Sequence, residues 1–422
     1  MQKKNVKREK AFLVGVVLSG TSRTQINEQL NELKSLADTA GADILSIGTQ
    51  IRHKPDAATF IGKGKLEQII SQADELECDL IIFNDDISPT QIKNVQNIAG
   101  DEMKVIDRTG LILDIFTKHA KTKEAKTQVE LAQLEYFLPR LTRQWTHLER
   151  QMGGIGTRAG AGETQIEIDR RLIRNRISRL KSELAAIEKQ RKVQSHGREG
   201  TYRIALVGYT NAGKSTLMNA LTGAQVLVQD QLFATLDTTT RKLDIDVGMP
   251  LLISDTVGFI RNLPHHLIAS FRSTLGEIMG VDMLLKVFDA SSENILQHID
   301  TVEEVLNKMD MSNKTSIMVF NKIDAVTTPE LLSGLKIRFK NANFISSLNN
   351  TGIDILISKM QETITLEFIQ DVFKLSFKQT KVMDTIYALT RVLSEKSDYN
   401  GISLEVEGTR QSLDKIRQIL DE

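Results

Sequence analysis

Residues 203 to 221, RIALVGYTNAGKSTLMNAL, constrain the fold more than any other part of the sequence. An apolar run of strand length leads into G-x-x-x-x-G-K-S, and a helical pattern follows at once. In such a loop the backbone amides and the helix N-terminus hold the β- and γ-phosphates of a nucleotide, Lys214 neutralises their charge and Ser215 coordinates Mg²⁺. The stretch predicts a phosphate-binding loop between a strand and a helix of an α/β domain. Its expected contact residues are Gly208, Tyr209, Thr210, Asn211, Ala212, Gly213, Lys214, Ser215 and Thr216.

The identity of the base is predicted from VFNKIDA, residues 319 to 325. A carboxylate at Asp324 accepts from the ring N–H and the exocyclic amine of guanine together, whereas adenine offers neither donor there. The sequence therefore predicts GTP as ligand, with GDP as its product. The residues expected around the base are Asn321, Lys322, Ile323 and Asp324, together with Ser346, Ser347 and Leu348, which follow a predicted strand.

Two segments between these motifs are predicted to respond to the γ-phosphate and to Mg²⁺. LLISDTVGFI places Asp255 at a strand end, in the Mg²⁺ shell through a water, and Gly258, whose amide contacts the γ-phosphate. QLFATLDTTTRKL offers Thr235 as the threonine that closes over Mg²⁺, although residues 238 to 240 compete for this role on spacing alone. The other expected contacts are Phe233, Ala234, Leu236, Asp237, Thr256 and Val257.

Phe259 stands where many GTP-hydrolysing switches have a glutamine that orients the attacking water. A phenyl ring cannot hydrogen-bond water, so we expect slow basal hydrolysis that a partner accelerates. In the alternative interpretation, Phe259 only packs under the switch and another side chain contacts the water. Asn211 adds the hypothesis of a K⁺ site, against a plain loop-capping role.

The whole chain predicts an α/β multidomain protein of four parts. Apolar runs alternate with helical patterns in residues 1–117, which is typical of a small parallel α/β domain. Residues 118–200 are long charged helical segments, and residues 201–365 form the nucleotide-binding domain. Residues 366–422 predict a small α+β domain, with the strand FKLSF, the helix TKVMDTIYALTRVLSEK, the strand GISLEVEG and the helix SLDKIRQIL.

Residues 118–200 are expected to form a long antiparallel helical arm, with helices at 124–150 and 163–192 and Pro139 kinking or breaking the first. From Lys118 to Arg203 there are 19 Lys and Arg against 10 Asp and Glu, whereas the whole chain has 54 of each. The connection QMGGIGTRAGAG predicts either a floppy turn or a loop that approaches the phosphates or bases of RNA. The candidates for RNA contact are Gly153, Gly154, Arg158, Gly160 and Gly162.

Composition excludes several other classes. The net charge of zero argues against a protein that coats DNA. Since no apolar run reaches about 18 residues, we expect no stable membrane insertion. A single cysteine, Cys78, rules out an intramolecular disulfide and fits a reducing cytoplasm. We therefore expect a cytoplasmic monomer.

Several stretches outside the nucleotide motifs are specific: DRTGLILDIFTKHA, EAKTQVELAQLEYFLPRL, GGIGTRAGAGET followed by DRR, and FATLDTTTR before DTVGFIRNLP. In these the chain resembles the HflX family of GTPases, related to the Obg group, over nearly its whole length. The family more often reads R-G-P-G-E-T and D-P-T-T-R, so this chain lacks a proline in each of two loops. The resemblance assigns the magnesium threonine to FATLD, hence to Thr235.

The resemblance also implies a function. It implies a GTPase that binds the large ribosomal subunit and splits 70S ribosomes, stalled ones in particular, with the glycine-rich tip reaching toward the peptidyl transferase region of the 23S rRNA. Some family members use ATP in the N-terminal domain, for which Gly62 to Lys65, at a predicted helix start, are the local candidates, against the alternative of a plain solvated turn. Two other hypotheses stay open: a nucleotide-gated switch that binds another RNA or protein, and an ATP-dependent RNA remodeller, although no helicase-like motif set is present.

Overall fold

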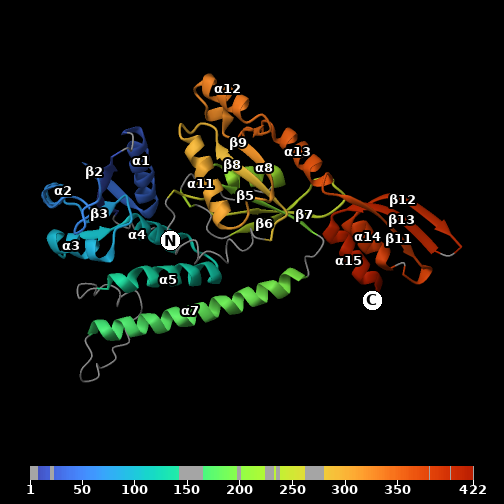
Figure 1. Cartoon of the computed structure of the whole chain (residues 1–422), viewed down its shortest axis with the longest axis horizontal. Coiled ribbons are helices and arrows are strands. Elements are labelled where there is room, and N and C mark those ends of the chain that lie inside the picture. The colour runs from blue at the N-terminus through green and yellow to red at the C-terminus, as the bar shows by residue number, and fades with distance from the viewer. Residues whose placement is uncertain are drawn as a thin grey trace, which may run out of the picture. The chain divides into compact units, whose positions relative to one another are not determined.

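The computed structural model describes residues 8–19, 23–141, 165–196, 201–223, 232–233, 238–261, 280–379, 381–399 and 401–421 (Figure 1). The chain divides into two compact units, one formed by Met1–Ala186 with Leu263–Phe271 and the other by Ile187–Asn262 with Arg272–Glu422. The finer division into four domains stays a prediction. Among the described residues, no helix is both long and apolar enough to cross a membrane.

The first unit contains a four-stranded sheet of order β2-β1-β3-β4 in which every pair of neighbours is parallel. Side chains of β1 alternate between its two faces, so that Phe12 and Val14 enter one apolar cluster with residues of the following helices. The parallel α/β prediction is thus confirmed. The strands are β1 (Glu9–Leu18), β2 (Ala42–Arg52), β3 (Leu80–Phe83) and β4 (Lys104–Ile106), and the helices are α1 (Arg23–Ala40), α2 (Lys63–Glu75), α3 (Pro89–Ala99) and α4 (Arg108–His119).

The helical region that follows holds α5 (Lys123–Phe137), the 3₁₀ turn η1 (Leu138–Arg140) and α7 (Gln165–His196). The regular helix predicted from residue 124 stops at Phe137, because Pro139 lacks the N–H that an α-helix needs and restricts the residue before it. α5 and α7 lie side by side, joined by an apolar cluster that includes Leu134 and Leu180 (Figure 1). Arg176 donates twice to the Glu130 carboxylate, at 2.6 and 2.8 Å. With 32 residues, α7 is roughly 48 Å long.

The second unit contains a six-stranded sheet of order β10-β9-β8-β5-β7-β6, parallel except for β6, which runs antiparallel to β7. Its strands are β5 (Tyr202–Gly208), β6 (Thr239–Leu243), β7 (Leu251–Asp255), β8 (Met283–Asp289), β9 (Thr315–Asn321) and β10 (Asn343–Phe344). Its helices are α8 (Lys214–Thr222), α11 (Ile295–Lys308), α12 (Pro329–Arg338) and α13 (Ile353–Thr365), with a 3₁₀ turn η2 (Ile323–Ala325).

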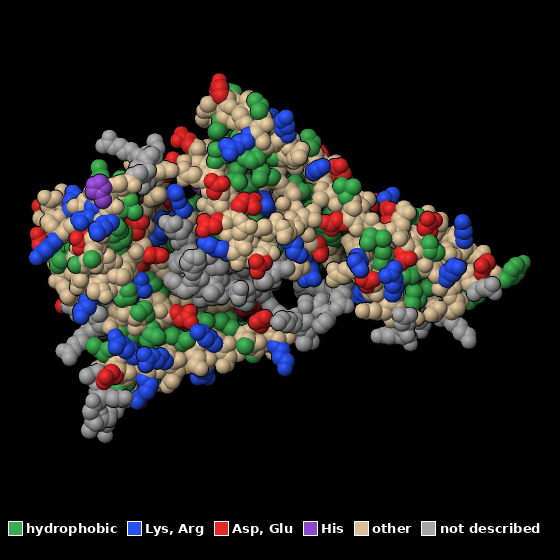
Figure 2. Space-filling model, in the orientation of Figure 1, with side chains coloured by type: hydrophobic (Ala, Val, Ile, Leu, Met, Phe, Trp, Pro, Cys, Tyr) green, Lys and Arg blue, Asp and Glu red, His purple; other side chains and the backbone are tan. Residues whose placement is uncertain are grey.

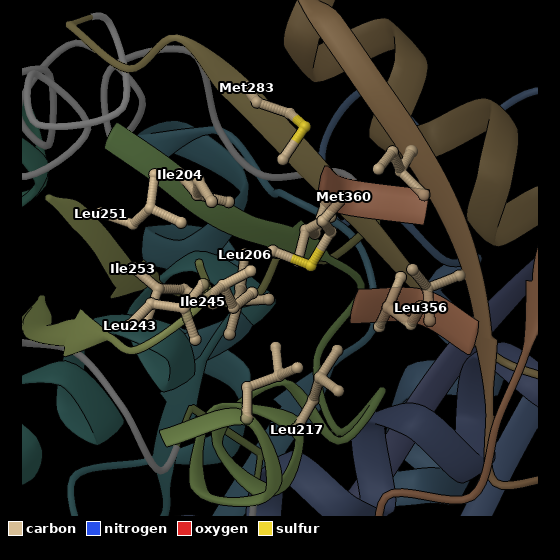
Figure 3. Close-up of a cluster of buried hydrophobic side chains, with 14 of the residues drawn as sticks. Ile204, Leu206, Leu217, Leu243, Ile245, Leu251, Ile253, Met283, Leu356 and Met360 are labelled. Carbon is tan, nitrogen blue, oxygen red and sulfur yellow. The ribbon is translucent and has the colours of Figure 1, made fainter. Parts of the chain in front are cut away.

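The core of this sheet fixes the strands that carry the predicted motifs. Leu206 of β5, Ile253 of β7 and Leu217 of α8 converge with Leu356 and Met360 of α13 in one apolar cluster (Figure 3). All five side chains are fully buried. Burial of each such side chain contributes about 1.5–3 kcal/mol. The cluster therefore holds the carboxyl ends of β5 and β7 in a fixed register.

The C-terminal region corrects one expectation. Residues 391 to 396, predicted as the end of a helix, belong to a strand that pairs antiparallel with β13, because pairing in a sheet overrides a weak helical preference. The helix before it ends at Leu389, and the buried Thr390 donates its hydroxyl to the Ile386 carbonyl. The elements are β11 (Ile369–Leu375), η3 (Phe377–Gln379), α14 (Lys381–Leu389), β12 (Arg391–Asp398), β13 (Gly401–Gly408) and α15 (Arg410–Asp421), with sheet order β11-β13-β12.

Candidate nucleotide-binding site

The predicted phosphate loop connects the end of β5 at Gly208 to the start of α8 at Lys214. Such a position, at the carboxyl ends of parallel strands and before a helix N-terminus, is where α/β sheets bind phosphates. Gly213 has a φ of 84°, and a Cβ there would lie 2.3 Å from the Asn321 side-chain nitrogen. Asn211 also adopts a positive φ, of 58°, which asparagine tolerates better than most residues. The loop conformation therefore depends on its glycine and asparagine.

Lys214 is buried and already oriented by the loop. Its ammonium donates to the carbonyls of Gly208 at 3.2 Å and Tyr209 at 2.9 Å. An ammonium has three donors, so one remains for a phosphate oxygen. Burial lowers the pKa of Lys214 to about 8, and the nearby Asp255 carboxylate opposes this shift. An anionic phosphate would oppose it further.

Ser215, the predicted magnesium ligand, and Asp255, predicted in the magnesium shell through a water, lie in direct contact. The Ser215 hydroxyl donates to the Asp255 carboxylate at 2.5 Å, and Asp255 is 2% exposed at the end of β7. Hydroxyl and carboxylate oxygens are the ligands that Mg²⁺ prefers, so the pair fits this ion. Beside them, Thr256 donates its hydroxyl to the Leu206 carbonyl at 2.6 Å and thereby ties β7 to β5.

Asn321 joins the three loops around the predicted guanine site. Its side-chain nitrogen donates to the Ala212 carbonyl at 3.0 Å, and its side-chain oxygen accepts from the Ser347 amide at 2.9 Å. Because these contacts occupy both ends of its amide, Asn321 holds the loops of the predicted base site together. Asp324 is exposed in η2 and Leu348 is 74% exposed, as residues that contact a base from solvent would be.

Phe259 lies on the phosphate loop through its backbone. Its N–H donates to the Gly208 carbonyl at 3.0 Å, and its carbonyl accepts from the Thr210 amide at 2.8 Å. The side chain is only 3% exposed. Burial fits the interpretation that the ring packs under the switch.

Three family models match the chain in sequence order. They are described as GTP-binding GTPase N-terminal over residues 27–117, GTP-binding GTPase Middle Region over residues 119–198, and 50S ribosome-binding GTPase over residues 203–322. A GTPase HflX of Flavobacterium psychrophilum is 44% identical over 385 residues, covering 86% of this chain and 92% of that protein. The GTPase HflX of Escherichia coli is 42% identical over 384 residues, covering 90% and 89%.

The chain belongs to the HflX family. It is a GTPase, built from the family's three segments and a further C-terminal sheet. A solved structure described as SsGBP in complex with GDP is 26% identical, with a TM-score of 0.47, and covers 84% of this chain and 98% of that chain. A GTP-binding protein of Sulfolobus solfataricus in complex with GDP is 25% identical, with a TM-score of 0.42, and covers the same shares.

Some predicted site residues of this HflX-family chain lie outside the described residues. They are Ala234, Thr235, Leu236 and Asp237, and the tip residues Gly153, Gly154, Arg158, Gly160 and Gly162. Their roles stay predictions. Phe233 is described, and it is buried with a φ of 58°.

Two residues of the site were missed in the sequence. Asp289, at the end of β8, forms an ion pair with Lys322 at 2.9 Å and so holds a predicted base-site residue. Its position directly after MLLKVF, a stretch that is apolar except for Lys286, was the available signal. His298 of α11 stacks on the Tyr209 ring, with centroids 3.9 Å apart and ring planes at 12°. No sequence pattern identifies that contact, since 89 residues separate the two rings.

The lowered pKa of Lys214 predicts that GTP affinity falls above about pH 8. A bound phosphate favours the charged form of Lys214. Above the pKa of the free lysine, GTP binding therefore takes up a proton. With a free-enzyme pKa of about 8, affinity decreases roughly tenfold between pH 7 and pH 9, measurable by titration with a fluorescent GTP analogue. Lys214→Met should bind GTP weakly at both pH values and should not show this decrease. The comparison separates the titration of Lys214 from that of the guanine ring. A constant affinity in the unmodified protein would contradict the prediction.

Proposed function

We propose that this GTPase binds the large ribosomal subunit and splits 70S ribosomes, under stress or when they stall, and that the ribosome stimulates its hydrolysis. The observation that carries the proposal is a row of exposed basic side chains on α7, in a chain of zero net charge. Figure 2 shows Lys and Arg side chains along this helix. Clustered cations of this kind bind the phosphates of RNA. They include Arg171, Arg174, Arg179, Lys181 and Lys189.

The family model over residues 203–322 supports the same partner, because its description names a 50S ribosome-binding GTPase. Phe259 supports stimulation in trans, since its side chain offers no hydrogen bond to an attacking water. In this mechanism GTP stabilises the conformation that binds the ribosome and hydrolysis releases it, which requires the two nucleotide states to differ in affinity for the ribosome. The glycine-rich tip would then approach the peptidyl transferase region of the 23S rRNA.

The proposal also covers the cofactors. Mg²⁺ would be held by Ser215 and Thr235, with Asp255 in its shell, and would neutralise charge on the phosphates. Asn211 remains the residue proposed to bind K⁺. For ATP, the candidate residues are Gly62 to Lys65. Lys63 is exposed, as a contact with phosphate requires. The Gly62 amide, however, already donates to the Gln50 side chain at 2.8 Å. The nucleotide-gated switch for another RNA or protein stays the alternative to ribosome splitting.

Sedimentation tests the proposed function. We expect 70S ribosomes incubated with the protein to separate into subunits with GTP or a non-hydrolysable analogue, but not with GDP or ATP. The double variant Arg174→Glu, Lys189→Glu reverses two exposed charges of α7 and should weaken ribosome binding at least tenfold while leaving GTP affinity unchanged. Lys340→Glu, an exposed reversal in the nucleotide-binding domain, is the matched control. Ribosomes that neither bind nor dissociate in any nucleotide state would overturn the proposal.

A further inference from the structure

Tyr209, the second residue of the phosphate loop, holds the segment after Gly258 from two sides. Tyr209 forms a parallel β-bridge with Phe259. In this bridge the Phe259 amide donates to the Gly208 carbonyl, and the Phe259 carbonyl accepts from the Thr210 amide. The Tyr209 side-chain hydroxyl accepts from the Arg261 amide at 3.1 Å. The residues on either side of Tyr209 and the Tyr209 side chain together therefore restrain residues 259 to 261.

Helix α11 also restrains residues 259 to 261. The imidazole of His298 stacks on the Tyr209 ring, which is only 6% exposed. At the neighbouring position, Gln297 accepts from the Arg261 guanidinium at 3.2 Å. The stack thus fixes the ring that receives the Arg261 amide, and α11 also holds the Arg261 side chain.

Gly258, which precedes residues 259 to 261, packs against the phosphate loop. A Cβ on Gly258 would lie 2.7 Å from the Thr210 Cα and 3.1 Å from the Lys214 ammonium nitrogen. A γ-phosphate oxygen bound by both the Gly258 amide and Lys214 needs about 2.9 Å to each donor. Because Gly258 packs this closely against Thr210 and Lys214, an oxygen placed between its amide and Lys214 would push Gly258 away from the loop and loosen the Phe259 bridge that follows it. GDP, which lacks this phosphate, makes no such demand.

We propose that Tyr209 and His298 are positioning residues that set the preference between GDP and GTP. Their stack stabilises the arrangement in which residues 259 to 261 lie on the phosphate loop, and GTP binding works against it. A stacked aromatic pair of this kind changes an equilibrium by roughly three- to tenfold. Removing the stack therefore favours GTP by about that factor. The inference concerns the isolated GTPase and does not depend on the ribosomal partner.

Nucleotide titration of the full chain tests this inference. We expect His298→Ala to raise affinity for a non-hydrolysable GTP analogue by roughly three- to tenfold and to leave GDP affinity unchanged, with a matching fall in the KM for GTP. His298→Phe keeps a ring on Tyr209 and should restore the original ratio. Tyr209→Phe removes only the hydroxyl that Arg261 uses and should shift the ratio in the same direction by a smaller factor.

Leu296→Ala, a truncation of an exposed side chain on the same helix, is the control and should change neither affinity. An unchanged ratio in both His298→Ala and Tyr209→Phe would overturn the inference. Equal losses of GDP and GTP affinity would also overturn it, since they would assign the stack a purely structural role. So would a His298→Phe variant that behaves like His298→Ala.

Discussion

Replacing Asp324 by asparagine is expected to lower GTP affinity about a thousandfold and to transfer the preference to xanthosine triphosphate. The carboxylate accepts two hydrogen bonds from guanine, each contributing about 1.5–3 kcal/mol because the acceptor is charged. Two such bonds correspond to roughly three orders of magnitude in affinity. Asparagine offers one acceptor and one donor, which match the ring N–H and the 2-carbonyl of xanthine.

The measurement is a competition between GTP and xanthosine triphosphate for Asp324→Asn and for the unmodified protein. Because Asp324 is exposed in η2, the change should leave the thermal unfolding midpoint nearly unaffected. Asp354→Asn, an exposed aspartate in the first turn of α13, is the matched control and should keep the original preference. An Asp324→Asn variant with undiminished GTP affinity would refute the assignment of the guanine site.

Gly208→Ala is expected to destabilise the nucleotide-binding domain more than any other change considered. An added Cβ would lie 2.1 Å from the Val287 carbonyl oxygen and 3.0 Å from its carbon, both in the backbone of the adjacent strand β8. No side chain can rotate to relieve this contact, so the strands must separate. We expect the free energy of unfolding to fall by about 3–5 kcal/mol and the unfolding midpoint to fall by roughly 10 °C or more.

Thermal unfolding followed by circular dichroism measures the effect. Gly334→Ala provides the control within the same unit, since a Cβ at that exposed position of α12 would meet no atom within 4 Å. Alanine is preferred over glycine inside a helix, so Gly334→Ala should raise stability by about 0.5–1 kcal/mol. A Gly208→Ala protein as stable as Gly334→Ala would show that β5 and β8 are not packed as described.

The sequence predicted the elements whose signals are local. The alternation of apolar runs and helices in the first domain is confirmed, and so is the strand, loop and helix at residues 202–222. The break at Pro139 was also predictable, because the missing N–H acts within one turn. Strand β12 was predicted as helix, since its conformation depends on pairing with β13 rather than on its own residues.

The phosphate loop and the family were recognisable in the sequence, because these motifs are short and their spacing is local. The guanine contacts stay predictions from the same kind of spacing. The contacts that hold the site together became visible in the folded chain alone. Asn321 bonds to Ala212 and Ser347, Asp289 pairs with Lys322, and His298 stacks on Tyr209. These partners come from different strands and helices. Their contacts arise from the packing of the sheet and its helices, for which no local spacing provides a signal.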